Sequence, residues 1–162
     1  NAAPALVLSA SYTDKGGNNV KALTGNSSIT LKSNTLTFTG NEKVKGFTPY
    51  KAPTSNLFLF PGGEGWFAFE NIDLTGVRSV NLTTGWQAPP KKGLNFEARL
   101  DAPDGKLLGK GSIPAPAKGQ QFGIIRVPIQ MVNDGKFHTI YFLYKGQEPI
   151  SGGVMSVQFN PK

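Results

Sequence analysis

The sequence contains no cysteine, and that absence excludes disulfide bonds, thiolate metal sites and a cysteine nucleophile. No stretch approaches the roughly 18 consecutive apolar residues that a membrane-spanning helix requires, so we expect a soluble chain without a membrane span. The chain also lacks a P-loop, a G-x-S-x-G nucleophile elbow and an H-E-x-x-H zinc motif. These absences remove the common local signatures of nucleotide, hydrolase and metalloprotease chemistry.

Arginine is scarce, although the chain is basic, with a formal net charge of +7 at pH 7. Such a charge favours an acidic partner, such as a nucleic acid, an anionic glycan or a cell envelope. However, only 3 of the 17 basic residues are arginines, and the cations are scattered, with only Lys91 and Lys92 adjacent. Proteins that read DNA sequence usually cluster arginine, so we expect a solvated basic surface and no nucleic-acid partner.

Histidine is nearly absent, since His138 is the only one in the chain. A Ser-His-Asp triad would have to use it, from within a predicted strand that also carries large apolar residues. That setting favours a histidine packed in the core or at its rim over a catalytic base. We therefore predict no catalytic residue and no enzyme.

Ten carboxylates leave a glycosidase open as an alternative, because that chemistry needs two facing carboxyl groups about 5 to 10 Å apart. Glu97 and Asp101 lie four residues apart, and Glu64 and Glu70 bracket another predicted strand. Nothing in their surroundings marks either pair as a cleft. Glu97 also stands two residues from Arg99, both at outward positions, and this spacing predicts a surface ion pair.

Acidic and amide side chains also gather in two Gly-containing segments. Asp14 with Asn18 and Asn19, and Asp134 with Asn133, could supply the oxygen ligands that calcium prefers. Asn-Asp-Gly sequences more often form simple turns, because the side chain bonds the backbone and glycine accepts a positive φ. The sequence leaves both interpretations open.

Glycine and proline are plentiful, with 20 and 12 residues, and they fall between short apolar runs as turn residues do. The runs alternate with period two, and no window sustains the period of a helix. Two pairs of runs predict hairpins: residues 28–32 with 35–39, and 94–100 with 107–113. The sequence thus predicts an all-β fold, a two-sheet antiparallel β-sandwich of the jelly-roll kind. The expected strands are residues 6–8, 28–32, 35–39, 57–60, 66–70, 77–83, 94–100, 107–113, 124–130, 137–144 and 154–159.

The alternation also predicts which side chains point inward. Phe96, Ala98 and Leu100 share one face of their strand, opposite the charged residues between them. Residues 137–144 are apolar on both faces, so we expect this strand to be central in its sheet.

Aromatic residues near turns are the candidates for ligand contact. Trp86 follows Thr83-Thr84-Gly85 and precedes a Pro-rich and Lys-rich segment, so we expect it in a loop. Phe47, Tyr50 and Phe122 also lie near turns. A ring held in a loop can stack on the apolar face of a sugar, while nearby amides bond the hydroxyl groups. Alternatively, these side chains cap the ends of the sandwich, since binding pockets are few in any protein.

Four segments together resemble the family 6 carbohydrate-binding modules, over about residues 35–160. The segments are "GEGWFAFENIDLTGVRSVNLTTG", "LNFEARLDAPDGKLLGKGSIPAP", "DGKFHTIYFLYKG" and "GGVMSVQFNPK". They are similar to the family's Gly-x-Trp strand, its E-x-R-L-D hairpin, its Gly-x-His-x-Ile-Tyr strand and its closing strand. Residues 6–34 resemble the lead-in that such modules have in exported bacterial multidomain proteins.

The resemblance implies a non-catalytic, galactose-binding-like β-jelly roll that binds polysaccharide at loops on one end. Phe60 and Phe122 fall nearest the family's two cleft aromatics, while the last loop reads Ser151-Gly152-Gly153 where an Asn is usual. The family's structural calcium takes carboxylates at the positions of Thr39 and Met155, so we expect the calcium site to be lost and no cofactor to bind.

These expectations combine into one prediction, a non-catalytic carbohydrate-binding module that is secreted or periplasmic. We expect residues 1–5 to be a linker or processed end, and residues 6–162 to be a single β-sandwich domain, a monomeric module of a larger protein. The alternatives are a structural or docking domain that has lost its sugar site, and a small hydrolase that uses Glu97 or Glu70. The candidate carbohydrate-binding residues are Trp86, Phe60, Phe122, Gln87, Gln120 and Asn95.

Overall fold

The structure is a computed structural model that describes residues 5–146 and 148–161. The chain divides into two compact units, residues 1–34 and residues 35–162, and each is described here by itself. Residues 1–4 of the expected linker lie outside the described residues, and Ala5 is the first residue of a strand. The extent of the predicted single domain, residues 6–162, stays a prediction.

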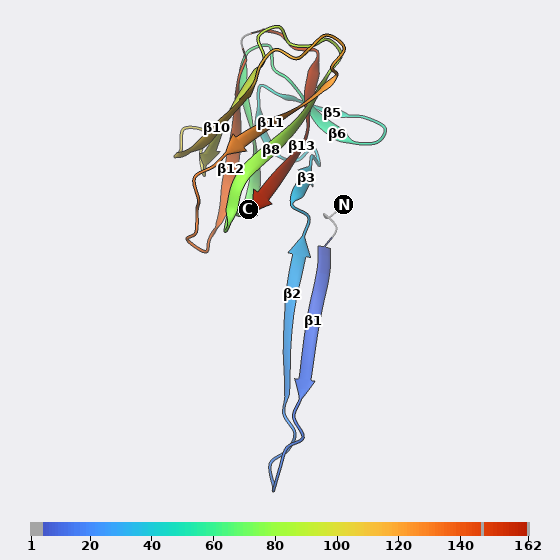
Figure 1. Cartoon of the computed structure of the whole chain (residues 1–162), viewed down its shortest axis with the longest axis vertical. Helices are drawn as coiled ribbons and strands as arrows, with labels where there is room; N and C mark the ends of the chain where they lie inside the picture. Colours follow the sequence, from blue (N-terminus) through green and yellow to red (C-terminus); the bar gives the residue numbers. More distant parts are fainter. Residues whose placement is uncertain (1–4, 147, 162) are drawn as a thin grey trace. The chain divides into compact units, whose positions relative to one another are not determined.

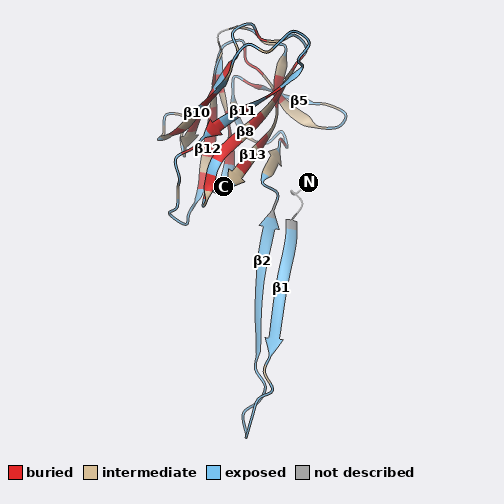
Figure 2. Ribbon diagram, viewed as in Figure 1, coloured by how far each residue is buried: buried red, intermediate tan, exposed pale blue. Residues whose placement is uncertain are grey.

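The first unit is a long antiparallel hairpin of β1 (Ala5–Thr13) and β2 (Thr24–Lys32). Figure 1 shows the two strands side by side, and residues 6–13 and 24–31 are exposed, as the colouring of Figure 2 shows. Asp14 closes the connection, because its Oδ1 accepts the backbone N–H groups of Gly16 and Leu23. These bonds lower the pKa of Asp14 and give it the turn role that the sequence left open.

The predicted hairpin of residues 28–32 with 35–39 is wrong. Residues 28–32 belong to β2 and pair with β1, whereas β3 (Thr35–Thr37) pairs with the last strand of the chain. The physical reason is that period-two alternation specifies a strand and its two faces but carries no information about the partner.

The second unit is a sandwich of two antiparallel sheets, as predicted (Figure 1). One sheet has the order β10-β9-β12-β7-β4, and the other has the order β11-β8-β13-β6-β5 with β3 alongside β13. The described residues contain no helix, and so none that is long and apolar enough to cross a membrane. The strands are β4 (Lys43–Lys45), β5 (Thr48–Lys51), β6 (Asn56–Leu59), β7 (Glu64–Asp73), β8 (Val77–Trp86), β9 (Leu94–Leu100), β10 (Leu107–Ile113), β11 (Phe122–Pro128), β12 (Phe137–Lys145) and β13 (Gly152–Pro161).

The hairpin of β9 and β10 is confirmed, with Phe96 opposite Gly111 and Leu94 opposite Ile113. Phe96 and Ala98 are fully buried as predicted, while Leu100 is half-buried at the end of the strand. The central place of residues 137–144 is also confirmed, since β12 pairs with β7 on one side and β9 on the other.

Phenylalanine rings from both sheets fill the space between them. Figure 2 marks the buried residues of the strands in red. Phe58 of β6 lies 5.7 Å from Phe67 of β7, and Phe142 of β12 lies 6.4 Å from Phe159 of β13, between ring centroids. Each such ring contributes about 1.5–3 kcal/mol through burial. This packed interior holds the outward faces of both sheets as rigid surfaces.

Glycine lets the edges of the two sheets approach each other. A Cβ atom on Gly109 of β10 would lie 1.8 Å from the carbonyl oxygen of Pro128 at the end of β11, so no side chain fits there. The backbone N–H of Gln130 donates to the carbonyl of Leu108 across the same contact. This closure fixes β11, which carries Phe122 at its start.

Candidate functional site

An open groove of about 570 Å³ lies on the outward face of the six-stranded sheet. Gly85 of β8 and Gly153 of β13 form part of its floor, because neither carries a side chain that would fill it. Tyr50 and Leu57, which are opposite each other on β5 and β6, line one side. Phe122 of β11 lines the other side.

Two aromatic rings are exposed at this groove. Phe122 is 58% exposed and Tyr50 is 51% exposed, whereas most phenylalanines of the chain are in the core. Alternation along β11 explains the position of Phe122, since Ile125 and Val127 point inward and Phe122 shares the opposite face with Ile124. The Phe122 ring leans over β8, where a Cβ atom on Gly85 would lie 3.3 Å from it.

Amide and hydroxyl groups stand at one end of the groove. The Oγ of Ser151 donates to the Oε1 of Gln87 at 3.0 Å, and the backbone N–H of Gln87 donates to the carbonyl of Ser151 at 2.8 Å. These bonds leave the side-chain NH₂ of Gln87 as a donor at the groove. Gln121 lines the same end. The groove thus combines exposed aromatic rings with polar groups held by the backbone.

Trp86 is not in a loop, contrary to the prediction, because β8 continues to residue 86. Its backbone borders the groove, but its side chain is only 5% exposed and belongs to the core. The indole Nε1–H donates to the carbonyl of Gln120, and a Cβ atom on Gly123 would lie 2.6 Å from the ring. The ring therefore has no exposed face on which a sugar could stack.

The other candidate residues are divided among several places. Phe60 is buried against Phe47, Phe96 and Tyr144, so its ring is part of the core. Gln120 uses its side-chain amide to hold the turn before β11, donating to the carbonyl of Phe122 at 2.9 Å. Asn95 lies on β9, in the other sheet. Of the six candidates, only Trp86, Gln87 and Phe122 border the groove.

Sequence reasoning noticed Tyr50 near a turn but did not include it among the candidates. Its importance comes from the strand order, which places β5 at the far edge of the sheet that begins with β11. All four residues of β5 are exposed, so the strand has no buried face. A search for alternating apolar and polar residues could not identify it. Nothing in the sequence therefore connected Tyr50 with Phe122.

The residues present do not fit the calcium ion that the resemblance implies. Glu42 lies near Thr39, but its Oε1 accepts the backbone N–H and the hydroxyl of Thr39, and its Oε2 accepts the N–H of Gly40. Met155 offers only a thioether, which is a poor ligand for calcium. Among the described residues, no three His, Asp or Glu side chains come together as metal ligands.

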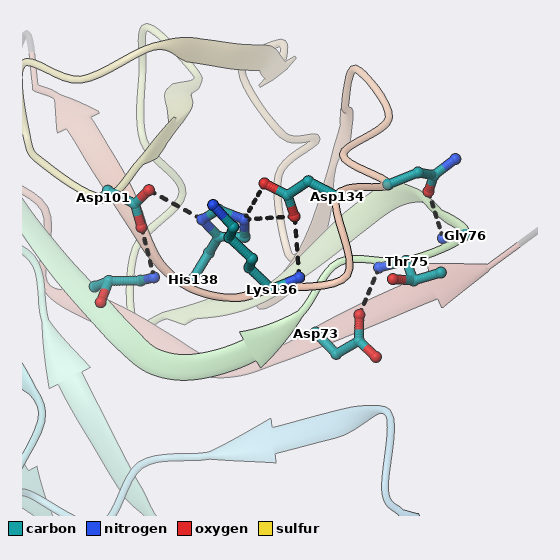
Figure 3. A network of polar contacts seen from close by, with 9 residues as sticks. Asp73, Thr75, Gly76, Asp101, Asp134, Lys136 and His138 are labelled. Carbon is teal, nitrogen blue, oxygen red and sulfur yellow. Dashed lines mark hydrogen bonds and ion pairs between the residues drawn. The ribbon is translucent and has the colours of Figure 1, made fainter.

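His138 lies between two carboxylates, as Figure 3 shows. Its Nδ1 is 2.9 Å from an oxygen of Asp101, and its Nε2 is 3.1 Å from both oxygens of Asp134. The hydrogen bonds to Asp101 and then to Asp134 raise the pKa of His138. The ring joins the turn after β9 to the turn before β12, and neither ring nitrogen is free to activate a serine.

Glu97 is held by three cations on the outward face of the five-stranded sheet. Its Oε2 binds Arg99 at 2.8 Å, and its Oε1 binds Lys110 at 3.0 Å and Lys145 at 3.4 Å. Burial raises the pKa of Glu97, but the bonds from Arg99 and Lys110 and the charge of Lys145 outweigh it and lower the pKa to about 2. The predicted ion pair with Arg99 is confirmed, within a larger cluster.

Solved structures show what fold this is. A family 6 carbohydrate-binding module from Clostridium cellulolyticum, in complex with xylose, is 18% identical, with 73% of this chain and 89% of that chain covered at a TM-score of 0.60. A module from Clostridium stercorarium in complex with cellobiose is 14% identical, and the alignment covers 79% of this chain and 93% of that chain at a TM-score of 0.62. A β-1,3-glucan-binding module from Bacillus halodurans is 16% identical, and the alignment covers 78% of this chain and 94% of that chain at a TM-score of 0.61.

These similarities establish that the chain has the β-sandwich fold of the family 6 carbohydrate-binding modules. No protein-family model matches the sequence, and a search of the curated proteins finds no relative. Function therefore has to be argued from the groove itself, because one fold hosts many functions.

Proposed function

We propose that this chain is a carbohydrate-binding module, and that the groove between Tyr50 and Phe122 is its sugar site. The observation that carries the proposal is the pair of half-exposed rings at opposite sides of a groove floored by glycine. An aromatic ring offers a flat apolar face, and the C–H face of a pyranose ring is its natural complement.

The polar end of the groove supports the same ligand class. The amide of Gln87 and the hydroxyl of Ser151 can bond sugar hydroxyl groups while the aromatic rings hold the ring faces. The similar modules bind xylose, cellobiose and β-1,3-glucan, which are all neutral. The lining of this groove is likewise free of charged side chains among the described residues. The proposed ligand is thus a neutral β-linked glycan.

The proposed module binds without catalysis, and without calcium or another cofactor. A glycosidase acid must be protonated near neutral pH, whereas the pKa of Glu97 is about 2. Glu70 is engaged in an exposed ion pair with Lys43 at 2.7 Å. His138 has both nitrogens engaged by carboxylates. We further propose that the module acts outside the cytoplasm as a monomeric part of a larger protein, where polysaccharides are found.

The test is calorimetry of xylan, cello-oligosaccharide and β-1,3-glucan fragments with the full chain and with Phe122→Ala and Tyr50→Ala. Phe137→Ala is the matched control, because Phe137 is an exposed aromatic of β12 outside the groove. Binding that both groove variants weaken and the control leaves unchanged supports the proposal. The absence of binding to all three glycans would instead favour a docking domain that has kept the fold and lost the sugar site.

A further inference from the structure

The hairpin of β1 and β2 has two chemically different faces. Residues that are opposite each other in an antiparallel pair point to the same side, and the register sets Leu6 opposite Leu31 and Tyr12 opposite Gly25. Every second residue along each strand shares this side. We call it the apolar face, and its residues are Leu6, Leu8, Ala10, Tyr12, Gly25, Ser27, Ile29 and Leu31.

The other side of the hairpin carries mainly hydroxyl groups. Ser9 is opposite Ser28, and Thr13 is opposite Thr24, with 2.8 Å between the two threonine hydroxyl oxygens. Val7 is the one large apolar residue on this side among the described side chains. Such a separation of apolar and polar residues is typical of a sheet that buries one face and exposes the other.

The apolar face is nevertheless open to solvent. Tyr12 is 75% exposed, Leu6 is 59% exposed and Ile29 is 58% exposed. Within the described part of the chain, no third strand pairs with either strand of the hairpin. A two-stranded hairpin alone is at best marginally stable in water, so a surface packed against this face would stabilise it.

The hairpin lacks the features that protect an exposed sheet. Residues 6–13 and 24–31 include no charged residue and no proline, and their register contains no bulge. A strongly charged partner would therefore find no complementary charge on the apolar face. Insertion into lipid is also unfavourable, because both edges of the hairpin have unpaired backbone groups. The surface that fits is an uncharged apolar face of similar length.

A second copy of the hairpin offers such a face. A two-fold axis parallel to the strands stacks β1 of one copy on β2 of the other. Each residue of β1 then lies over the second copy's version of its own cross-strand neighbour, so Leu6 lies over Leu31 and Tyr12 lies over Gly25. Gly25 is the one position of the apolar face without a side chain, and a Cβ atom there would meet nothing within 4 Å. The large ring of each copy thus enters an open position on the other.

The area of the apolar face limits the strength of this pairing. Five large side chains from each copy would be covered, which removes roughly 800–1,000 Å² from water in total. Specific and stable interfaces bury about 1,200–2,000 Å². The pairing of two hairpins is therefore weak, and the chain is monomeric when it is dilute.

We propose that the hairpin is a self-association surface, through which two copies of this chain pair by stacking their apolar faces, with Tyr12 of each copy over Gly25 of the other. This surface is distinct from the sugar groove, because none of its residues lines the groove. The inference does not depend on the proposed function, since the pairing needs no glycan.

The experiment is analytical ultracentrifugation of the full chain from about 10 µM to about 1 mM, a range chosen for a weak interface. The key variant is Leu8→Thr with Ile29→Thr, which removes apolar surface but keeps residues that favour strands. Val7→Thr is the matched control, because it removes an exposed apolar side chain from the hydroxyl side. Gly25→Val tests the stacking, since its side chain fits within its own chain but occupies the position of the second copy's Tyr12.

We expect a monomer–dimer equilibrium with a dissociation constant of about 0.1–1 mM. The threonine pair and Gly25→Val should each weaken dimerisation at least about tenfold, whereas Val7→Thr and Phe122→Ala should leave it nearly unchanged. Valine favours a strand more than glycine does, so a loss in Gly25→Val cannot come from a disrupted hairpin. Amide hydrogen exchange in β1 and β2 of the parent should also slow as its concentration rises.

Several outcomes would overturn the proposal. A chain that stays monomeric at about 1 mM does so directly, as does dimerisation that Val7→Thr weakens as much as the threonine pair or that Gly25→Val leaves intact. Dimerisation that Phe122→Ala abolishes would assign the contact to the groove. Flotation with vesicles of phosphatidylcholine and phosphatidylglycerol tests the lipid alternative. Vesicle binding by a monomeric parent that the threonine pair abolishes would assign the apolar face to a membrane surface.

Discussion

Trp86 and Phe122 lie at paired ends of neighbouring strands but point to opposite faces of the same sheet. Phe122 is opposite Gly85 in the register of β11 and β8, and the backbone N–H of Trp86 donates to the carbonyl of Gln121. The ring of Trp86 is 5% exposed and that of Phe122 is 58% exposed. Trp86 therefore stabilises the sandwich as part of its core, and Phe122 is available to a ligand.

The first prediction concerns the exposed rings. Phe122→Ala and Tyr50→Ala should each weaken neutral-glycan binding about tenfold, because each removes one stacking face worth about 1.4 kcal/mol. Stability should change by less than about 0.5 kcal/mol, since both side chains are exposed. Calorimetry and thermal unfolding of the same samples separate the two effects. Affinity that survives in both variants would place the sugar elsewhere.

The second prediction concerns Trp86. Trp86→Ala should destabilise the fold by about 3–5 kcal/mol, because it leaves a cavity in the core and removes the bond to the Gln120 carbonyl. Trp86→Phe should retain most of the packing and should bind glycans like the parent. Denaturant unfolding measures the first effect and calorimetry the second. A Trp86→Phe protein that is stable but does not bind glycans would show that the Trp86 side chain takes part in sugar binding.

The sequence could predict much of the sandwich because its signals are local. The alternation of Phe96 and Ala98 specifies a face, the paired runs at residues 94–100 and 107–113 specify a hairpin, and the doubly apolar run at residues 137–144 specifies a central strand. The partners of residues 28–32, and the exposed strands β4 and β5, could not be predicted in this way. Their pairing depends on contacts between distant parts of the chain.

The site was harder to predict than the fold for a related reason. Turn-like sequence suggested that Trp86 is exposed, and Phe60 was a candidate through the family resemblance, but burial depends on which sheet face each strand end presents. Phe122 was found because it stands next to a turn, and it happens to point outward. Tyr50 joins it through a strand order that links residues 48–51 to residues 122–128 across the six-stranded sheet. No local pattern carries that information.

The third prediction uses the pH dependence of stability at His138. Its folded pKa is raised, mainly by Asp101 and then by Asp134, so the charged ring stabilises the fold fully below the unfolded value of about 6.5. That contribution is lost as the pH rises through the folded pKa. The melting temperature of the parent should therefore exceed that of His138→Gln most at pH 5 to 6, and the difference should shrink toward pH 9.

Thermal unfolding at one-unit pH steps checks this difference. Lys136→Gln is a useful control, because Lys136 bonds Asp134 through its backbone N–H, which the substitution keeps, and its charge is the smallest of the influences on the pKa of Asp134. A difference between the parent and His138→Gln that stays constant from pH 5 to 9 would show that the ring acts through packing alone.

The fourth prediction concerns the contribution of Glu97 to stability. Glu97→Gln leaves Arg99, Lys110 and Lys145 without their shared carboxylate, so the fold should lose about 1–2 kcal/mol near neutral pH. Because the folded pKa is about 2, the parent keeps this contribution above the unfolded value of about 4.3 and loses it as the pH falls toward 2. Unfolding of both proteins from pH 7 to pH 2 should therefore converge at the acidic end.

Glu70→Gln is the matched control for Glu97→Gln, since it removes a carboxylate from the same sheet face but from an exposed pair with Lys43. The stability of Glu70→Gln should stay close to that of the parent at every pH, because exposed ion pairs contribute little. A stability difference between the parent and Glu97→Gln that stays constant from pH 7 to pH 2 would show that the charge of this carboxylate does not stabilise the fold through Arg99, Lys110 and Lys145.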